Sequence, residues 1–136
     1  MQEPEFWAKL VLEATVSPSE DPLRVAKALG NVVGEPPEET TPGARSVRHE
    51  TESKKALGQV RDHLRDRHVR AAARRQLLLR TKGNSASLML NRQAAAAGVV
   101  AICGVPDESP LGPVYLTLKS DKLDAVIDWL AAYSEG

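Results

Sequence analysis

Arginine is concentrated in one short stretch of the chain, and arginine is the side chain best suited to holding a phosphate group. Residues 61–82 include eight arginine or lysine residues, seven of them arginine, against only two aspartates. A planar guanidinium can hold a phosphate through two hydrogen bonds and can also stack on an unpaired base. On a helix, Arg67, Arg70 and Arg74 fall within a sector of about 60°. Such a stripe could follow a phosphate backbone, so the sequence predicts an RNA-binding surface here.

Residues further along the chain extend this predicted surface. Lys82 lies in the turn that follows the stripe, and Asn91 is expected to begin a short helix whose N-terminus would attract anions. The full set of predicted RNA-contacting residues is Arg67, Arg70, Arg74, Arg75, Arg80, Lys82, Asn91, Arg92 and Gln93. Asn91 also has a simpler interpretation, because asparagine is a preferred N-cap and a cap needs no ligand.

The net charge of zero conceals a strong partition along the chain. Residues 53–92 contain 11 basic and 2 acidic side chains, whereas residues 1–52 contain 5 basic and 10 acidic ones. Residues 93–136 contain 2 basic and 6 acidic side chains. Two interpretations therefore stay open: the basic segment meets RNA, or it meets acidic surfaces in the same chain, a dimer mate or another protein.

No pattern of residues indicates catalysis, a metal or a cofactor. His63 and His68 are five residues apart and would lie on different faces of a helix, so the spacing does not predict a metal site. Cys103 lies in an apolar run, where a cysteine is usually an inert small hydrophobic residue. Aromatic residues are absent from the basic segment, which argues against base-specific readout. We therefore expect a binding protein that recognises RNA shape and phosphates, and not an enzyme.

Length and composition predict one soluble domain spanning residues 1–136. Hydrophobic residues make up 42% of the chain, and its 136 residues are enough to bury a core without disulfides or metals. A single cysteine fits a reducing compartment. The acidic start is unlike a secretory signal, and no apolar run approaches the roughly 20 residues that span a bilayer. We expect a cytoplasmic protein that does not contact membranes.

Hydrophobic periodicity predicts an α+β fold with a mainly antiparallel sheet packed by helices. The strands are expected within 7–16, 44–50, 85–90, 99–103 and from 114 onward. The helices are expected from Pro22 to Gly34, from Ser53 to a break near 67–69, from Arg70 to Arg80, over 92–97, and from about 121. Residues 34–43 hold three prolines and two glycines among acidic residues, which indicates a mobile loop within the domain.

Three stretches resemble a family of small archaeal proteins described as RNA-binding. They are LVLEATVSPSEDPLRVAKAL near the N-terminus, LMLNRQAAAAGVVAIC in the middle and SPLGPVYLTLKSDKLDAVIDWLA near the C-terminus. The resemblance covers about half of the chain in matching order. Two positions depart from the family pattern: Arg92 stands where it has lysine, and Ser19 where it usually has threonine.

The resemblance implies a fold like that of the large-subunit ribosomal protein that binds 5S rRNA, and often a homodimer. It implies RNA as a partner only through that structural analogy, because a fold does not fix a function. The alternative function is a protein-interaction or structural module whose basic segment pairs with an acidic partner or with its own dimer mate.

Overall fold

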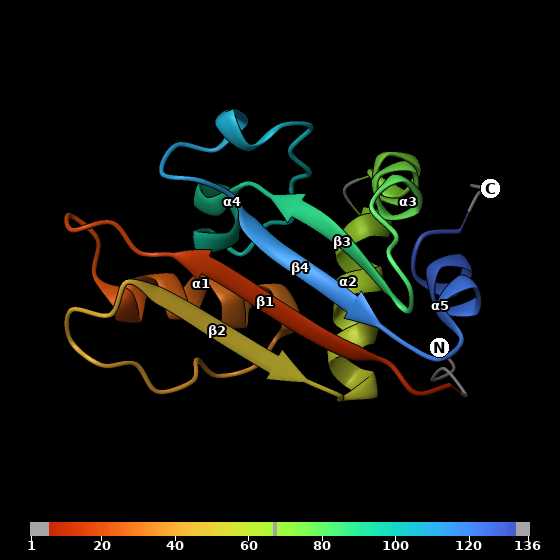
Figure 1. The fold of residues 1–136 in the computed structure, drawn as a ribbon, viewed down its shortest axis with the longest axis horizontal. Coiled ribbons are helices and arrows are strands. Elements are labelled where there is room, and N and C mark those ends of the chain that lie inside the picture. The colour runs from red at the N-terminus through yellow and green to blue at the C-terminus, as the bar shows by residue number, and fades with distance from the viewer. Residues whose placement is uncertain (1–5, 67, 133–136) are drawn as a thin grey trace.

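The computed structural model describes residues 6–66 and 68–132, in which one antiparallel sheet is packed by helices (Figure 1). Its strands are β1 (Lys9–Thr15), β2 (Ser46–Thr51), β3 (Ser85–Leu90) and β4 (Val114–Lys119). The helices in this part of the chain are α1 (Pro22–Val33), α2 (Lys54–Asp66), α3 (Arg70–Leu79), α4 (Arg92–Ala96) and α5 (Leu123–Leu130), with a 3-10 turn, η1, at Pro106–Glu108. The predicted α+β class with an antiparallel sheet is confirmed.

One face of the sheet is buried along all four strands, and Val11 and Met89 on the other face are buried as well. The strand order is β2-β1-β4-β3, and every neighbouring pair is antiparallel. Leu12 lies opposite Leu116, which lies opposite Leu88, and all three are fully buried. Because side chains on a strand point to opposite faces in turn, one face of the sheet carries these leucines and builds the core. The alternation that predicted β1 and β4 is confirmed.

The predicted break between two helices is also present. α2 ends at Asp66 and α3 begins at Arg70, with His68 between them at a φ of 57°. Leu64 and Leu77 are both fully buried. In one straight helix these two leucines would lie about 140° apart around the axis at 100° per residue, so the chain has to change direction to bury both.

The apolar run at residues 99–103 is not a strand, and this prediction was wrong. Only Ile102 forms an isolated bridge, to Leu90 at the end of β3. Val100 and Cys103 are buried, which explains the apolar composition. The run therefore packs against the core beside β3 without becoming a fifth strand of the sheet.

Two side chains of the acidic loop at residues 34–43 contact β2. The Glu35 carboxylate lies 2.7 Å from His49 Nε2, and the Glu38 carboxylate accepts a hydrogen bond from the backbone N–H of Glu50. These contacts fix where two side chains of the loop sit. The mobility of this loop stays a prediction.

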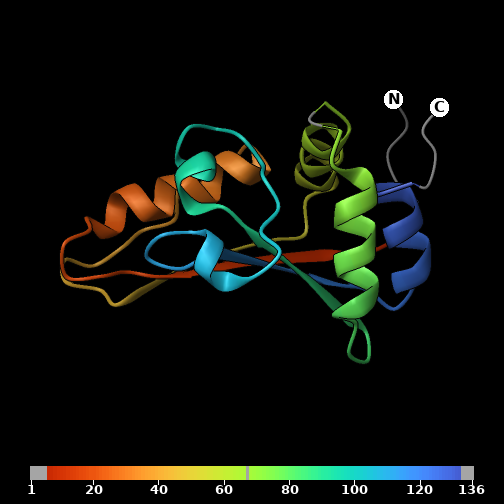
Figure 2. The ribbon, with the colours of Figure 1, turned by 90° about the horizontal axis from the view of Figure 1, so that it is seen from above.

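The second face of the sheet carries no helix of the described residues and is called the open face below. Figure 2 shows the sheet edge-on, with α1, α2 and α4 on one side. α3 crosses the plane of the sheet beside β3, so that its C-terminal end and the turn at 81–84 project past the open face (Figure 2). By the strand register, the open-face residues are Lys9, Val11, Glu13, Thr15, Ser46, Arg48, Glu50, Ser85, Ser87, Met89, Tyr115, Thr117 and Lys119.

Candidate RNA-binding surface

Two arginines of the basic segment are held by α5. Arg74 Nη2 lies 2.7 Å from Asp128 Oδ1, and Arg74 Nη1 donates to the carbonyl of Ala131. Arg61 Nε donates to the carbonyl of Trp129, and its guanidinium carbon lies 4.6 Å from the centre of the indole ring. Both arginines therefore join α2 and α3 to the last helix.

These contacts correct the predicted stripe of three arginines. Arg74 lies against α5, because an aspartate from the acidic last third of the chain pairs with it. Arg70 begins α3 and is half-buried. Arg67 lies outside the described residues. The stripe is therefore not one continuous solvent-facing surface along α3.

Another group of basic residues gathers where α3 ends beside the open face. Lys82 pairs with Ser85 in an isolated bridge, and Ser85 lies opposite Lys119 of β4. Arg80, at the end of α3, reaches Ser87 of β3. The side chains of Arg80, Lys82 and Lys119 are exposed, and none of them takes part in an ion pair within the described part of the chain. We call the following set the basic corner: Arg80, Lys82 and Lys119. Arg75 is also exposed, but it lines the groove between α3 and residues 102–108 that contains Glu108.

Arg80 extends from the end of α3 onto the open face. Its Nε donates to Ser87 Oγ at 2.9 Å, and its guanidinium carbon lies over the Tyr115 ring, 6.0 Å from the ring centre. Sequence reasoning did not select Tyr115. The alternation of buried Val114 and Leu116 nevertheless predicts that the residue between them points away from the core.

The β1–β2 half of the open face neutralises its own charges. Lys9 pairs with Glu50 at 2.8 Å, and Arg48 pairs with Glu50 at 2.6 Å and with Glu13 at 3.6 Å. The hydrogen bond from Lys9 lowers the pKa of the Glu50 carboxyl, and Arg48 lowers it as well. By contrast, β3 and β4 contain no carboxylate. The uncompensated positive charge of the open face therefore lies on the β3–β4 half.

Asn91 and Gln93 have different surroundings, although they are close in sequence. Asn91 caps α4, since its side chain accepts a hydrogen bond from the backbone N–H of Ala94 at 2.8 Å. Asn91 therefore acts as a helix N-cap, which was the simpler of its two predicted roles. Gln93 is exposed on the same short helix.

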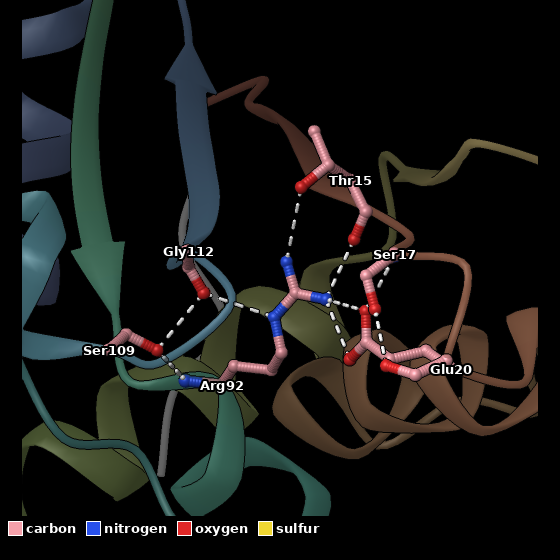
Figure 3. A network of polar contacts seen from close by, with 7 residues as sticks. Thr15, Ser17, Glu20, Arg92, Ser109 and Gly112 are labelled. Atoms are coloured by element: carbon pink, nitrogen blue, oxygen red, sulfur yellow. Dashed lines mark hydrogen bonds and ion pairs between the residues drawn. The ribbon is translucent and has the colours of Figure 1, made fainter.

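Arg92 is buried, with 5% of its surface exposed, and its guanidinium is engaged within the protein (Figure 3). Its Nη1 donates to both carboxylate oxygens of Glu20, at 2.8 and 3.0 Å, and to the carbonyl of Thr15. Its Nε donates to the carbonyl of Gly112. The expectation that Arg92 contacts RNA needs correction, because its hydrogen-bonding capacity is used by Glu20 and backbone carbonyls.

This buried network joins the three stretches that carry the family resemblance. Glu20 comes from the first stretch, Arg92 from the second, and Ser109 and Gly112 from the third; the Ser109 hydroxyl accepts from the backbone N–H of Arg92 and donates to the Gly112 carbonyl (Figure 3). The network lies near α4, at the far end of β3 from the turn at 81–84 (Figure 1). The two halves of the predicted site are therefore separate in space.

An open pocket of about 540 Å³ lies beside the buried network, between α1 and α4. Glu20 and Asp21 line it together with Arg24 and Arg92. Charges of both signs meet there, so this pocket shows no clear preference for an anion.

The remaining chemical groups fit structural roles. Cys103 is buried, and burial raises the pKa of its thiol, with the Glu108 carboxylate adding to the effect. The described residues contain no group of three histidine, cysteine, aspartate or glutamate side chains that could hold a metal ion. None of the helices in the described ranges has the length and apolar character needed to cross a membrane.

Comparisons with known proteins show close relatives. A protein from Sulfurisphaera tokodaii called UPF0201 protein is 34% identical over 124 residues, covering 90% of this chain and 86% of the relative. A UPF0201 protein from Metallosphaera sedula is 32% identical with similar coverage. No family model matches the chain.

Solved structures support the fold. The crystal structure of a UPF0201 protein from Methanococcus jannaschii superposes with a TM-score of 0.76, covering 94% of this chain and 96% of that one, at 23% identity. The crystal structure of another, uncharacterised UPF0201 protein gives a TM-score of 0.78 at 22% identity. At this level of identity the likeness concerns the fold alone.

Proposed function

The chain belongs to the archaeal UPF0201 family, and we propose that it is a non-catalytic, cytoplasmic RNA-binding protein. One observation carries the proposal. The basic corner places three cations where α3 meets the β3–β4 half of the open face, and none of the ion pairs among the described residues includes them. A likeness to the ribosomal protein that binds 5S rRNA belongs to the same proposal and rests on the resemblance of sequence motifs.

The basic corner favours recognition of phosphates over recognition of base sequence. Lysine and arginine neutralise phosphates and release the counterions that surround a nucleic acid, which gives affinity without sequence specificity. The proposal made from the sequence is thus kept, but the set of residues proposed to contact RNA changes. Arg80 and Lys82 remain and Lys119 is added. Arg75 lies in the groove with Glu108, and Arg74 and Arg92 are assigned to the fold.

The salt dependence of binding tests this proposal. In the variant Lys82→Gln/Lys119→Gln, two adjacent charges are removed from the basic corner. Each phosphate contact contributes about 0.7 to 0.9 to the slope of log affinity against log salt concentration. We therefore expect the slope, measured by fluorescence anisotropy with labelled RNA, to become shallower by about 1.5.

The matched control is Lys54→Gln/Lys55→Gln, which removes the same charge from the first turn of α2. Both lysines are exposed, and a cation at a helix N-terminus does not stabilise the helix, so the control should fold normally. Its salt slope should equal that of the wild type. An equal loss in both variants would show that only total charge matters, and an unchanged slope in the first variant would remove the basic corner from the proposal.

A homodimer is the second candidate, and the exposed face of α3 favours it. Leu78 and Leu79 are 49% and 78% exposed there. Leu79 borders a groove of about 490 Å³ between α3, β3 and residues 102–108, which also contains Arg75 and Glu108. A two-fold interface brings the same patch of each copy together. Arg75 of one copy could then meet Glu108 of the other.

A further inference from the structure

We infer that the basic corner selects unpaired RNA by holding one base against the Tyr115 ring on the open face of the sheet. This inference rests on the proposed RNA binding and names the form of RNA that the site takes. An aromatic ring on an uncovered sheet face is a general way of stacking single-stranded bases. The basic segment itself contains no aromatic residue, and Tyr115 lies outside that segment, on β4.

Tyr115 is placed so that a ligand can approach it. The residue lies at the second position of β4, opposite Met89 of β3 and Glu13 of β1. It belongs to the open face, which no helix of the described residues covers, and it is half-buried. The strand on each side fixes the backbone beneath the ring, so little conformational freedom has to be lost when a base stacks on it.

Arg80 already makes a cation–π contact with the Tyr115 ring. Its guanidinium carbon lies 6.0 Å from the ring centre, at the outer limit of such contacts. A base that stacks on the ring has to displace this guanidinium or lie between the two groups, which needs a separation of roughly 7 Å, twice the contact distance. The exposed side chain of Arg80 can make that movement by giving up its hydrogen bond to Ser87.

The groups around Tyr115 suit a ribose–phosphate backbone. Ser87 and Thr117 lie opposite each other one residue pair beyond Met89 and Tyr115 on the same face, and their hydroxyls can donate or accept hydrogen bonds. Lys119 follows Thr117 after another two residues, about 6.8 Å along the strand. The backbone of a single strand would thus run from Tyr115 toward Lys119 and Lys82.

One carboxylate of the sheet stands beside Tyr115, and Asp121 and Asp124 line a hollow with the turn at 81–84 at the other end of this path. Glu13 is the neighbour of Tyr115 on β1, and its charge is met by Arg48 at 3.6 Å. Phosphates would therefore avoid the β1 side of the ring and follow the β3–β4 half, where no carboxylate is present on the strands. This restricts the single-stranded RNA to one path across the sheet.

The arrangement distinguishes single-stranded RNA from a duplex. In an A-form duplex the bases are stacked on one another, so their faces are unavailable to Tyr115, and side chains cannot read the deep, narrow major groove. A single strand presents free base faces together with its phosphates. We expect the protein to bind labelled oligoadenylate more tightly than the same strand paired with oligouridylate at equal salt.

Three substitutions at Tyr115 test the stacking. Tyr115→Phe keeps the ring, Tyr115→Leu keeps a shorter apolar side chain without a ring, and Tyr115→Ala removes both. Alanine substitution of a stacking residue weakens binding by roughly 5- to 100-fold per base. We expect the alanine and leucine variants to show this loss toward oligoadenylate, and the phenylalanine variant to stay close to the wild type.

The outcomes separate this inference from the proposed function. If leucine and phenylalanine bind oligoadenylate equally well, base stacking on Tyr115 is wrong, while phosphate binding by the basic corner stands. Duplex binding as tight as single-strand binding would also overturn the inference alone. A wild-type protein that binds neither RNA at low salt would remove the proposed function, and the stacking site with it. Circular dichroism of each variant checks that the loss does not come from unfolding.

Discussion

Each nitrogen of the Arg92 guanidinium donates a hydrogen bond within the protein. A buried charge is tolerated only when it is paired and hydrogen-bonded, because leaving water costs several kcal/mol per ion. Glu20 supplies the opposite charge, the carbonyls of Thr15 and Gly112 accept from Nη1 and Nε, and the Thr15 hydroxyl accepts from Nη2. Arg92 therefore joins the end of β1, the start of α4 and the turn before β4.

Removing this charge should destabilise the fold strongly. Arg92→Met keeps much of the side-chain length but leaves the Glu20 carboxylate and two carbonyls without their donor. Breaking a buried pair by removing one partner costs about 3–5 kcal/mol. We expect a loss of that size in the free energy of unfolding, measured by urea denaturation.

A double substitution identifies the cause of that loss. Glu20→Gln combined with Arg92→Met removes the unpaired charge, so it should cost clearly less than the sum of the two single variants. Gln93→Met, at the exposed neighbouring position, should change stability by no more than about 0.5 kcal/mol. Additive effects of the two substitutions would show that Glu20 and Arg92 do not act as a pair.

Local sequence could predict where arginine is abundant, but not which arginines are free. The partner of Arg92 is 72 residues away, and that of Arg74 lies on the last helix. A helical wheel compares only residues of one helix, so such long-range partners are invisible to it. Tyr115 was missed for the related reason that it meets the basic segment only in the folded sheet.

At the scale of elements, one side chain completes the edge of the sheet. Gln76 of α3 accepts a hydrogen bond from the backbone N–H of Met89 at 2.5 Å and donates to the carbonyl of Cys103 at 2.8 Å. The backbone N–H of Cys103 in turn donates to the carbonyl of Met89. The side-chain amide thus takes the place of a peptide group between the edge strand and residues 99–103.

Removing the amide should loosen this edge. Gln76→Ala leaves the N–H of Met89 and the carbonyl of Cys103 without these partners, which costs about 1–3 kcal/mol for a buried group. Hydrogen exchange at the amide of Met89 should accelerate, because local opening becomes easier. Gln93→Ala, on exposed surface, is the control and should leave that exchange rate unchanged. Equal exchange at Met89 in both variants would contradict the bridging role of Gln76.

The same region shows where prediction of the elements succeeded and failed. Alternation predicted β1 and β4, because the leucines on one face of each are fully buried. β3 was expected as a strand without such a pattern, and both Leu88 and Met89 are buried in it. The break between α2 and α3 followed from the pitch of a helix. The run at 99–103 has the composition of a strand because it is partly buried, but composition does not specify a pairing partner. Gln76 occupies part of the edge along which such a strand would have paired.

At the scale of the whole molecule, the net charge is zero, but the basic and acidic residues of the described chain are only partly paired with each other. Asp128 neutralises Arg74 and Glu20 neutralises Arg92, so the acidic thirds do meet part of the basic segment. The cations of the basic corner take no part in the ion pairs among the described residues, and neither do Lys54 and Lys55 at the start of α2. The basic corner borders the exposed leucines of α3, so RNA and a second copy of the chain would compete for adjacent surface.

Measuring the size of the purified protein in solution tests whether two copies of the chain form the proposed homodimer. If Leu78 and Leu79 form a two-fold interface, the wild type should elute as a dimer, and Leu78→Ser/Leu79→Ser should shift it toward a monomer. Their exposure means that the free energy of unfolding of the monomer should change by no more than about 0.5 kcal/mol for each substitution. Leu23→Ser, at an exposed leucine on α1, is the matched control and should leave the dimer intact. Monomeric wild type over the whole accessible concentration range would contradict the dimer and leave this face of α3 open for the RNA that the basic corner is proposed to bind.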